Sequence, residues 1–247
     1  MPVHIIDRGG QVLHESEDDQ MCDAVEQAVE ENADLAGADL AGADLRGANL
    51  EDACLEGADL TGACLDGANL EDADLEGAKL DDVSARGANF ENARMSRASL
   101  ARANLSGANF EKVDLQGAVL EAAHALRANF ERARMSEVRA CAAVLRQANI
   151  EKSDLRKADL SQVDLSGANL EKSDLRDANL TAALLTGSNF EKADLRGADM
   201  SDADLSEANL EKCEVEGACF HGANLAGANI EKMNGRLRSR GGSGPYR

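Results

Sequence analysis

The chain has 247 residues, of which 43% are hydrophobic but only 2% aromatic, and it carries a formal net charge of −20 with no tryptophan. So few aromatic residues exclude an ordinary globular core built on large rings. No window contains the roughly 20 apolar residues that a membrane-spanning helix needs, and no apolar run follows a basic start as in a signal peptide. We therefore expect a cytoplasmic protein that does not contact membranes.

Residues 1–32 lack a repeat and are predicted to form an N-terminal cap. The segments VHIID and VLHES, joined by RGGQ, are typical of a short β-hairpin. A helix is predicted next, because five apolar residues share one helical face: Met21, Ala24, Val25, Ala28 and Val29. Ser16 and Asp19 have the spacing of a capping box before it. The polar face of this helix is acidic, which disfavours the alternative of an amphipathic membrane helix.

From residue 33 the sequence repeats every five residues. Forty consecutive centres run from Leu35 to Ile230 without insertion or deletion, and the residue two before each centre is Ala in 32 of the 40 cases. A helix or a flat strand would rotate successive centres to different sides. A chain that turns a corner after each short face keeps Leu and Ala on a common axis. The repeat therefore predicts a solenoid whose units bury their apolar sides against each other.

A second period of twenty residues gives the number of faces. Glu follows an Asn-X pair at ten positions from Glu51 to Glu231, always twenty residues apart. Four pentapeptides then make one coil, and ten coils would measure roughly 48 Å at ~4.8 Å per strand. Sixteen glycines lie two residues after a centre, where a type II turn needs positive φ. None lies on the Asn-X-Glu face, so we expect a different turn geometry at the corner that follows it.

The uninterrupted A(D/N)LxG repeat resembles the pentapeptide-repeat family, over residues 33–230. The resemblance implies an all-β solenoid, a right-handed quadrilateral parallel β-helix with the central Leu or Phe and the small residue before it inside. Residues 231–247 are basic and rich in Gly and Ser, and we predict that they are disordered. Met233 and Leu237 are candidates to fold over the last coil. The last coil otherwise has an open apolar end, which predicts a homodimer through the C-terminal coil.

No constellation of residues points to catalysis. The five-residue register gives none of the four histidines a nucleophile or carboxylate partner: His4, His14, His124 and His221. The six cysteines form no C-x-x-C pair and are predicted to be reduced thiols. The glycines follow the structural repeat instead of a phosphate-binding pattern, and a convex solenoid lacks a concave pocket. We predict no enzyme, no catalytic residue, no cofactor and no metal site.

The negative charge is concentrated toward the N-terminus. Residues 33–100 carry −10, which over about 16 Å of axis is one charge per ~1.6 Å, close to the ~1.7 Å of duplex DNA. From residue 112 onward each Glu of the Asn-X-Glu face is followed by Lys or Arg, but Glu51 and Glu71 are followed by Asp52 and Asp72. We expect no nucleic acid binding. The candidate partner-binding surface is acidic: Glu51, Asp52, Glu71, Asp72, Asp74, Glu76, Asp81 and Asp82.

Two functional interpretations follow, beside the possibility that the acidity only solubilises the protein. In the first, the chain is a non-catalytic scaffold that presents its acidic N-terminal half to a protein with a basic surface. The alternative follows from the family resemblance, because quinolone-resistance members are similar in shape and charge to DNA and occupy the DNA-binding saddle of gyrase or topoisomerase IV. This sequence differs from them in its uninterrupted coils, its nearly neutral C-terminal half and its lack of a recognisable C-terminal dimerisation helix.

Overall fold

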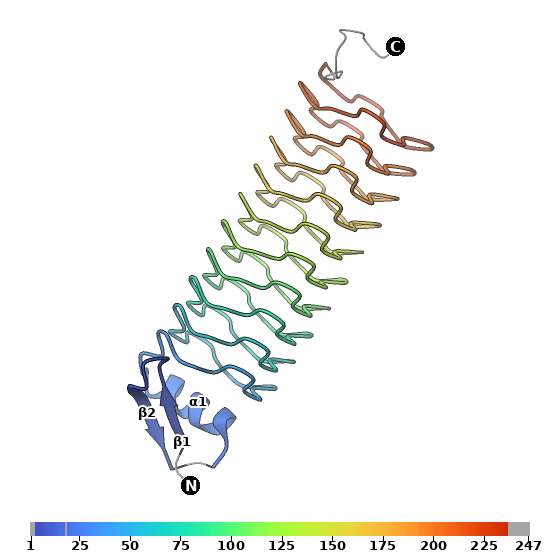
Figure 1. The fold of residues 1–247 in the computed structure, drawn as a ribbon. Coiled ribbons are helices and arrows are strands. Elements are labelled where there is room, and N and C mark those ends of the chain that lie inside the picture. The colour runs from blue at the N-terminus through green and yellow to red at the C-terminus, as the bar shows by residue number, and fades with distance from the viewer. Residues whose placement is uncertain (1–2, 18, 237–247) are drawn as a thin grey trace.

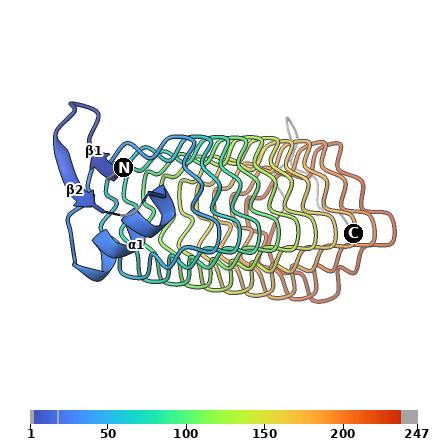
Figure 2. The same cartoon turned by 90° about the horizontal axis from the view of Figure 1, so that it is seen from below.

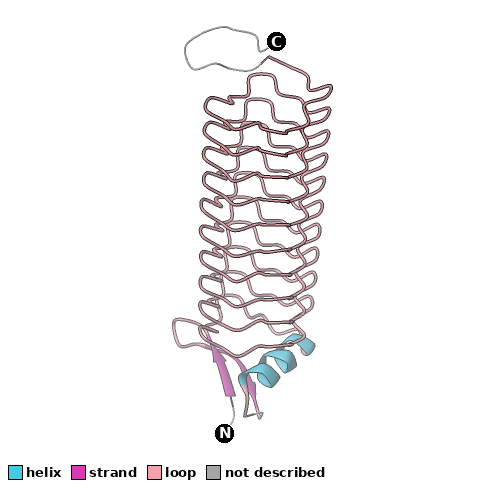
Figure 3. Cartoon of the chain, turned by 90° about the vertical axis from the view of Figure 1, so that its right-hand side faces the viewer, coloured by secondary structure: helices cyan, strands magenta, loops and turns pink. Residues whose placement is uncertain are grey.

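The computed structural model describes residues 3–17 and 19–236. It is a straight stack of coils with a small hairpin and helix at the N-terminal end and the last described coil at the far end (Figure 1). The hairpin consists of the antiparallel strands β1 (Val3–Ile6) and β2 (Val12–Ser16), and α1 (Met21–Glu30) follows. In the described residues, helix and named strands occur only at this end, and the coils themselves consist of turns and isolated bridges (Figure 3).

The hairpin and α1 cover the first coil (Figure 2). The Asp39 N–H donates to the Ile6 carbonyl at 2.8 Å, which extends the hydrogen bonding of the hairpin into the solenoid. Val25 and Ala28 of α1 are fully buried in the core cluster. Arg8, from the hairpin turn, forms an ion pair with a carboxylate of the second coil. The open apolar end that a solenoid would otherwise expose is therefore closed at the N-terminus.

The start of α1 differs from the predicted capping box, which is wrong. The helix begins at Met21 after Gln20, whose side chain forms no capping hydrogen bond. Ser16 lies in β2 opposite Val3, and its hydroxyl donates to Oε1 of Gln27 at 2.7 Å. Strand pairing holds Ser16 five residues before the helix, so Gln20 and not Ser16 occupies the N-cap position.

The coil of twenty residues is held by backbone hydrogen bonds of parallel type. Residues twenty apart form parallel bridges from Asp34 with Cys54 to Glu214 with Asn234. At a typical coil, the Leu50 N–H donates to the Asn69 carbonyl at 2.7 Å. Each corner adds a bond within the coil, such as Ala53 N–H to the Leu50 carbonyl at 3.1 Å. Consecutive coils thus satisfy each other's backbone groups, and the chain forms a quadrilateral solenoid.

The core is a column of central residues flanked by small ones. The centres from Leu35 to Phe220 are buried, as are nearly all the alanines two residues before them. The rings of Phe90, Phe110 and Phe130 stack with centroids 4.8 Å apart, which gives the rise per coil. Where Ser replaces Ala, the hydroxyl bonds to backbone inside the core, as in Ser173 and Ser188. Such bonds satisfy the polar groups that the narrow core buries.

All four corners have the same conformation, so the prediction of a different turn after the Asn-X-Glu face is wrong. The third corner residue has a positive φ in all forty pentapeptides, from 64° to 75° for the sixteen glycines and from 54° to 61° for the other residues. Asp52 and Lys112 on the Asn-X-Glu side have φ of 59° and 56°. Their cost in the left-handed region is about 1–2 kcal/mol each, which the regular bonding between coils offsets.

The C-terminal end is more exposed than the N-terminal end. Leu225 and Ile230 in the last coil are 36% and 52% exposed, whereas Met233 packs against the core. Leu237, predicted to cover the last coil, and most of the basic segment 231–247 lie outside the described residues. No helix in the described part of the chain has the length and apolar character to cross a membrane. A cytoplasmic location stays a prediction.

Candidate interaction surface

The solenoid has four flat faces, which we name by their first central residue. Face A is centred on Leu35, face B on Leu40, face C on Leu45 and face D on Leu50, and each continues with every twentieth residue. Corners are named by the faces they join. Positions ten residues apart, such as the DA and BC corners, lie diagonally opposite each other.

The Asp or Asn before each central residue has a structural role that the sequence reasoning missed. Its side-chain oxygen accepts the backbone N–H two residues later, as Asp34 does from Ala36 at 3.0 Å and Asn69 from Glu71 at 3.3 Å. This is an Asx turn, and where Asp or Asn is present it satisfies the corner N–H that the neighbouring coil does not reach. The A(D/N)L spacing itself carries this signal.

On face D these residues also form a continuous ladder. The Asn69 Nδ2 donates to the Asn49 Oδ1 at 3.1 Å, and every later Asn of the face repeats the bond up to Asn229 with Asn209. The ladder fixes the asparagine side chains of face D. The glutamates that follow this face form a row at the DA corner, with one Glu in each coil. A flat, regularly spaced charged row is therefore a property of the fold.

The structure brings six of the eight predicted acidic residues together and separates the other two. Glu51, Asp52, Glu71 and Asp72 lie at the DA corner, Asp74 lies on the adjoining face A, and Glu76 lies at the AB corner on the other edge of that face. Asp81 and Asp82 lie at the BC corner, ten residues further on, which places them diagonally across the solenoid. One partner surface therefore cannot include all eight residues.

Several of these carboxylates are neutralised by cations from the next coil. Arg94 binds Asp74 at 2.9 Å and Glu76 at 3.1 Å, and Arg97 also pairs with Glu76. The guanidinium of Arg97 lowers the pKa of Glu76 below its usual range. Asp82 likewise pairs with a guanidinium, that of Arg102, which lowers its pKa. Asp81 accepts hydrogen bonds from the Ser99 hydroxyl and the Ala101 N–H.

The other four predicted acidic residues form a row without neighbouring cations, and α1 adds a further carboxylate to it. Within the described residues, no Lys or Arg lies at ion-pair distance from Glu51, Asp52, Glu71 or Asp72, nor from Glu30 of α1. A groove of about 300 Å³ between α1 and the DA corner is lined by Glu26, Glu30, Glu51 and Asp52, among others. The acidic edge is defined here by five residues: Glu30, Glu51, Asp52, Glu71 and Asp72. Sequence reasoning missed the contribution of α1, although a helix predicted to close the first coil must bring some of its acids to this corner.

Further along the same corner the charge is balanced. The Lys112 Nζ lies 2.9 Å from Glu91 and 3.1 Å from Glu111. From Glu111 to Glu211 each Glu that follows face D lies close to a Lys or Arg of its own coil, as at Glu211 with Lys212 at 2.6 Å. The acidic edge is thus confined to the N-terminal coils, in agreement with the uneven charge of the sequence.

Two histidines and one cysteine of the cap lie near carboxylates. His4 is 3.8 Å from Glu15 and His14 is 4.0 Å from Glu31, so the expectation that no histidine has a carboxylate neighbour is wrong for the cap, where the five-residue register does not apply. Possible ligand atoms of Cys22, Asp23 and Glu26 lie within 4.8 Å of one another. Burial, then the carboxylates of Glu26 and Asp23, raise the pKa of the Cys22 thiol, which disfavours the thiolate that binds metals.

The repeats identify the class of protein. The family model for pentapeptide repeats matches the chain in overlapping segments from residues 31–62 to 203–234. The chain belongs to the pentapeptide-repeat family, and its solenoid is a right-handed quadrilateral β-helix of that family. Among curated proteins, no match to the chain was found.

Solved structures of the same family resemble the chain to different extents. HetL from the cyanobacterium Nostoc sp. strain PCC 7120, described as involved in heterocyst differentiation regulation, is 30% identical, covers 81% of this chain and 89% of its own, and has a TM-score of 0.56. Rfr23 from the cyanobacterium Cyanothece 51142 is 32% identical over 35% of this chain and 59% of its own, with a TM-score of 0.35. QnrB1, a plasmid-mediated fluoroquinolone resistance protein, is 21% identical over 67% and 88%, with a TM-score of 0.36.

Proposed function

We propose that this protein is a non-catalytic scaffold that binds a basic surface of a partner protein through its acidic edge. The observation that carries the proposal is the contrast along the DA corner. Glu51, Asp52, Glu71 and Asp72 have no Lys or Arg at ion-pair distance in the described chain, whereas the glutamates of the row from Glu111 to Glu211 each lie close to one. Stacked like charges repel each other, so an uncompensated row costs stability that an incoming basic partner would recover.

Two further features support a binding role. The faces are flat and hydrogen-bonded along their whole length, so the charged row is held rigidly and binding would need little ordering of the chain. HetL, which is similar over most of its length, is described as involved in regulation. We infer that this chain acts by binding and not by catalysis.

A charge-reversal experiment tests the acidic edge. Immobilised wild-type protein is compared with the double variant Glu51→Lys/Glu71→Lys in binding proteins from a native extract. The matched control is Glu191→Lys/Glu211→Lys, which changes the same residue type in the same row by the same charge but in the compensated coils. We expect a specific partner to be lost with the first variant and kept with the second. Equal capture by all three proteins would contradict the proposal, provided that circular dichroism shows all three folded.

A type II topoisomerase is the alternative partner. The charge of residues 33–100 per length of axis is close to that of DNA, as argued from the sequence, although Asp81 and Asp82 lie away from the acidic edge and Asp82 is paired with Arg102. A gyrase supercoiling assay distinguishes the two interpretations. Inhibition or protection at stoichiometric protein, lost in Glu51→Lys/Glu71→Lys, would favour DNA mimicry, and no effect at large excess would exclude it.

We further propose that the last coil is covered by a second copy of the chain. Leu225 and Ile230 are exposed there, at the only solenoid end that the cap does not close within the described residues. Two such ends can meet without bringing the acidic edges together, because these lie at the opposite end. Light scattering should give a dimer mass that falls to a monomer mass in Ile230→Glu. A monomer at all concentrations of the wild type would exclude this assembly.

A further inference from the structure

Face C changes character in its middle coils. In five successive coils of this face, the position before the central residue is occupied by Asn104, His124, Val144, Asp164 and Leu184. The bridges connect these residues in one row, His124 to Val144 to Asp164 to Leu184. The row therefore replaces the usual Asx acceptor by apolar or basic side chains in three of its four coils.

This replacement leaves backbone donors without a side-chain acceptor. The Ser166 N–H donates to Asp164 Oδ1 at 3.0 Å, as is usual for this position. The N–H groups of Leu126 and Arg146 have no such partner, since within the described chain no side-chain oxygen accepts them. Both residues are exposed, so these donors face outward. A ligand with oxygen acceptors would satisfy them.

Large apolar side chains are exposed in this row and at the corner beside it. Leu126 is 40% exposed and Leu184 is 48% exposed. The other large hydrophobic residues exposed to a similar degree in the described chain lie in the hairpin or the last coil: Ile6, Val12, Leu225 and Ile230. Leu126 and Leu184 are thus isolated from the ends of the solenoid, and their exposure is not a consequence of an incomplete coil.

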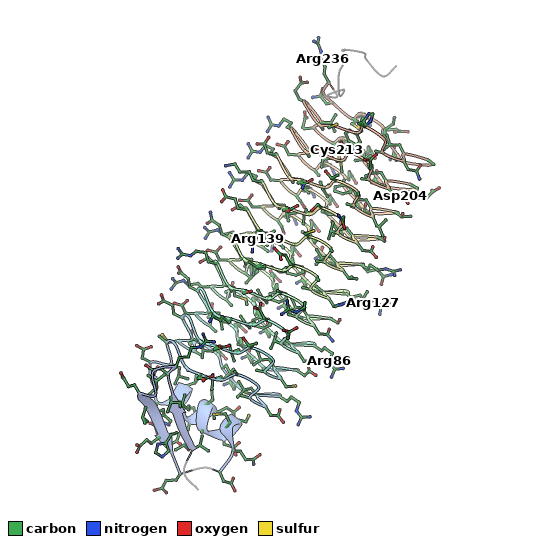
Figure 4. All side chains as sticks on the ribbon, viewed as in Figure 1. Arg86, Arg127, Arg139, Asp204, Cys213 and Arg236 are labelled. Atoms are coloured by element: carbon green, nitrogen blue, oxygen red, sulfur yellow. The ribbon has the colours of Figure 1, made fainter. Side chains whose placement is uncertain are left out.

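Cations border this apolar row. Arg127 donates its Nε to Gln147 Oε1 at 2.8 Å, and within the described residues no carboxylate lies at ion-pair distance from it. The carboxylate closest to Arg146 is that of Asp164, at 3.8 Å. Both guanidinium groups, with Leu126 and Val144, line a groove of about 430 Å³. Figure 4 shows Arg127 extending from the long side of the solenoid that also carries Arg86 and Asp204.

We propose that face C from His124 to Leu184 is a second docking site, which binds an acidic segment of a partner protein. A branched apolar side chain of that segment packs on Leu126 and Val144, while its carboxylates accept from Arg127, Arg146 and the free N–H groups. Charge complementarity decides the occupant, because Arg127 and Arg146 line this groove and Arg127 has no carboxylate at ion-pair distance within the described residues. The site lies on another face than the acidic edge and does not depend on the function proposed for that edge.

Peptide binding tests the chemistry of the site. The probe is a short fluorescein-labelled peptide of repeating Asp-Leu-Glu, whose fluorescence anisotropy is followed on titration with the full chain at physiological salt. We expect saturable binding below about 1 mM, with the amide resonances of Leu126 and Arg146 shifting in the labelled protein. Lysine in place of the peptide's acids, or alanine in place of its leucines, should abolish binding. Equal binding of either control peptide, or no binding of the probe, would overturn the proposal.

A consensus substitution removes the site without harming the fold. Val144→Asp restores the Asx acceptor and adds a negative charge next to Arg146. The resulting Asp-Leu-Arg sequence is that of residues 154–156, where the Arg156 Nε donates to the Asp154 Oδ1 at 2.7 Å. The matched control Val119→Asp makes the same change on face B. We expect at least about fivefold weaker binding for Val144→Asp and less than about twofold change for Val119→Asp. Equal loss in both variants, or loss in Glu51→Lys/Glu71→Lys instead, would refute a site on face C. Self-association that competes with the probe would show that the occupant is a second copy, and would overturn the assignment to a separate partner.

Discussion

The rings of Phe90 and Phe110 lie parallel, with an interplanar angle of 1° and centroids 4.8 Å apart. Aromatic pairs adopt edge-to-face as well as stacked arrangements, and these rings adopt the parallel stack. The coil spacing imposes it, because successive residues of one face must lie directly above each other. Core packing and the spacing of surface charges are therefore set by the same repeat.

Truncation of a stacked ring tests this packing. Phe110→Ala should lower the free energy of unfolding by about 3–5 kcal/mol, because a narrow column with neighbours on both sides cannot collapse into the cavity. Phe110→Leu should cost much less, since leucine fills the equivalent position in Leu50 and Leu70. Urea unfolding followed by circular dichroism measures both. A loss below about 1 kcal/mol for Phe110→Ala would contradict the close packing of the column.

The uniform corner predicts opposite effects of glycine and alanine. Gly107 has a φ of 70°, and a Cβ placed there would meet no atom within 4 Å, so Gly107→Ala should destabilise through the backbone alone, by about 1 kcal/mol. Ala142 has a φ of 57°, and Ala142→Gly should raise the melting temperature. Differential scanning calorimetry compares the two. A shift of the same sign in both variants would show that the corners are not strained.

The carboxylate of Asp66 should make stability sensitive to acid. The guanidinium of Arg86, with further hydrogen bonds from the Ser84 hydroxyl and the Arg86 N–H, lowers the pKa of Asp66 to about 2 from its usual 3.8. Because the pKa of Asp66 is lower in the folded than in the unfolded protein, its ionised carboxylate stabilises the fold at pH values above about 4. This stabilisation is lost as the pH falls from about 4 to about 2. Carboxyl carbon NMR should give a midpoint well below 3.8 that rises in Arg86→Gln. A midpoint at the ordinary value in the wild type would contradict the pairing.

Cysteine reactivity should separate the inner and outer positions of the repeat. Burial raises the pKa of the Cys213 thiol to about 12, and its Sγ lies 2.9 Å from the Phe190 carbonyl. Iodoacetamide at pH 8 should therefore leave Cys213 unmodified in the folded protein and modify it in urea, whereas the exposed Cys54 should react in both. Cys213→Ser should keep the fold, because Ser173 occupies the same position and makes the equivalent bond. Peptide mass mapping gives the result, and modification of native Cys213 would contradict its burial.

The solenoid could be predicted from the sequence because each of its rules is local. Leu at one position and Ala two before it need only the five-residue spacing to be placed inside. The uniform corner could not be predicted from Gly content, since Asp52 and Lys112 adopt the same positive φ. The hairpin and α1 follow no repeat, and the predicted cap at Ser16 failed because strand pairing outweighed a local capping signal.

The candidate site was predicted less completely than the fold. The sequence was used to count charges along the solenoid axis, but not to assign each charge to one of the four faces. The period of twenty already places Asp81 ten residues from Glu71, across the solenoid. The pairing of Glu76 with Arg94 and Arg97 also joins residues about one coil apart in sequence. Glu30 could not be assigned to the edge without knowing how α1 crosses the first coil. Sequence reasoning did not identify face C, because it did not recognise the role of the Asx position.

Site-specific photo-cross-linking in the native cell tests the central claim, that the acidic edge contacts a protein partner, most directly. A benzophenone amino acid replaces either Asp72 at the DA corner or Asp202 at the BC corner, both of which have the same left-handed backbone, with φ of 58° and 57°. We predict a cross-linked product of one defined mass from position 72 and none from position 202. Equal products from both positions, or no product from position 72, would contradict the account.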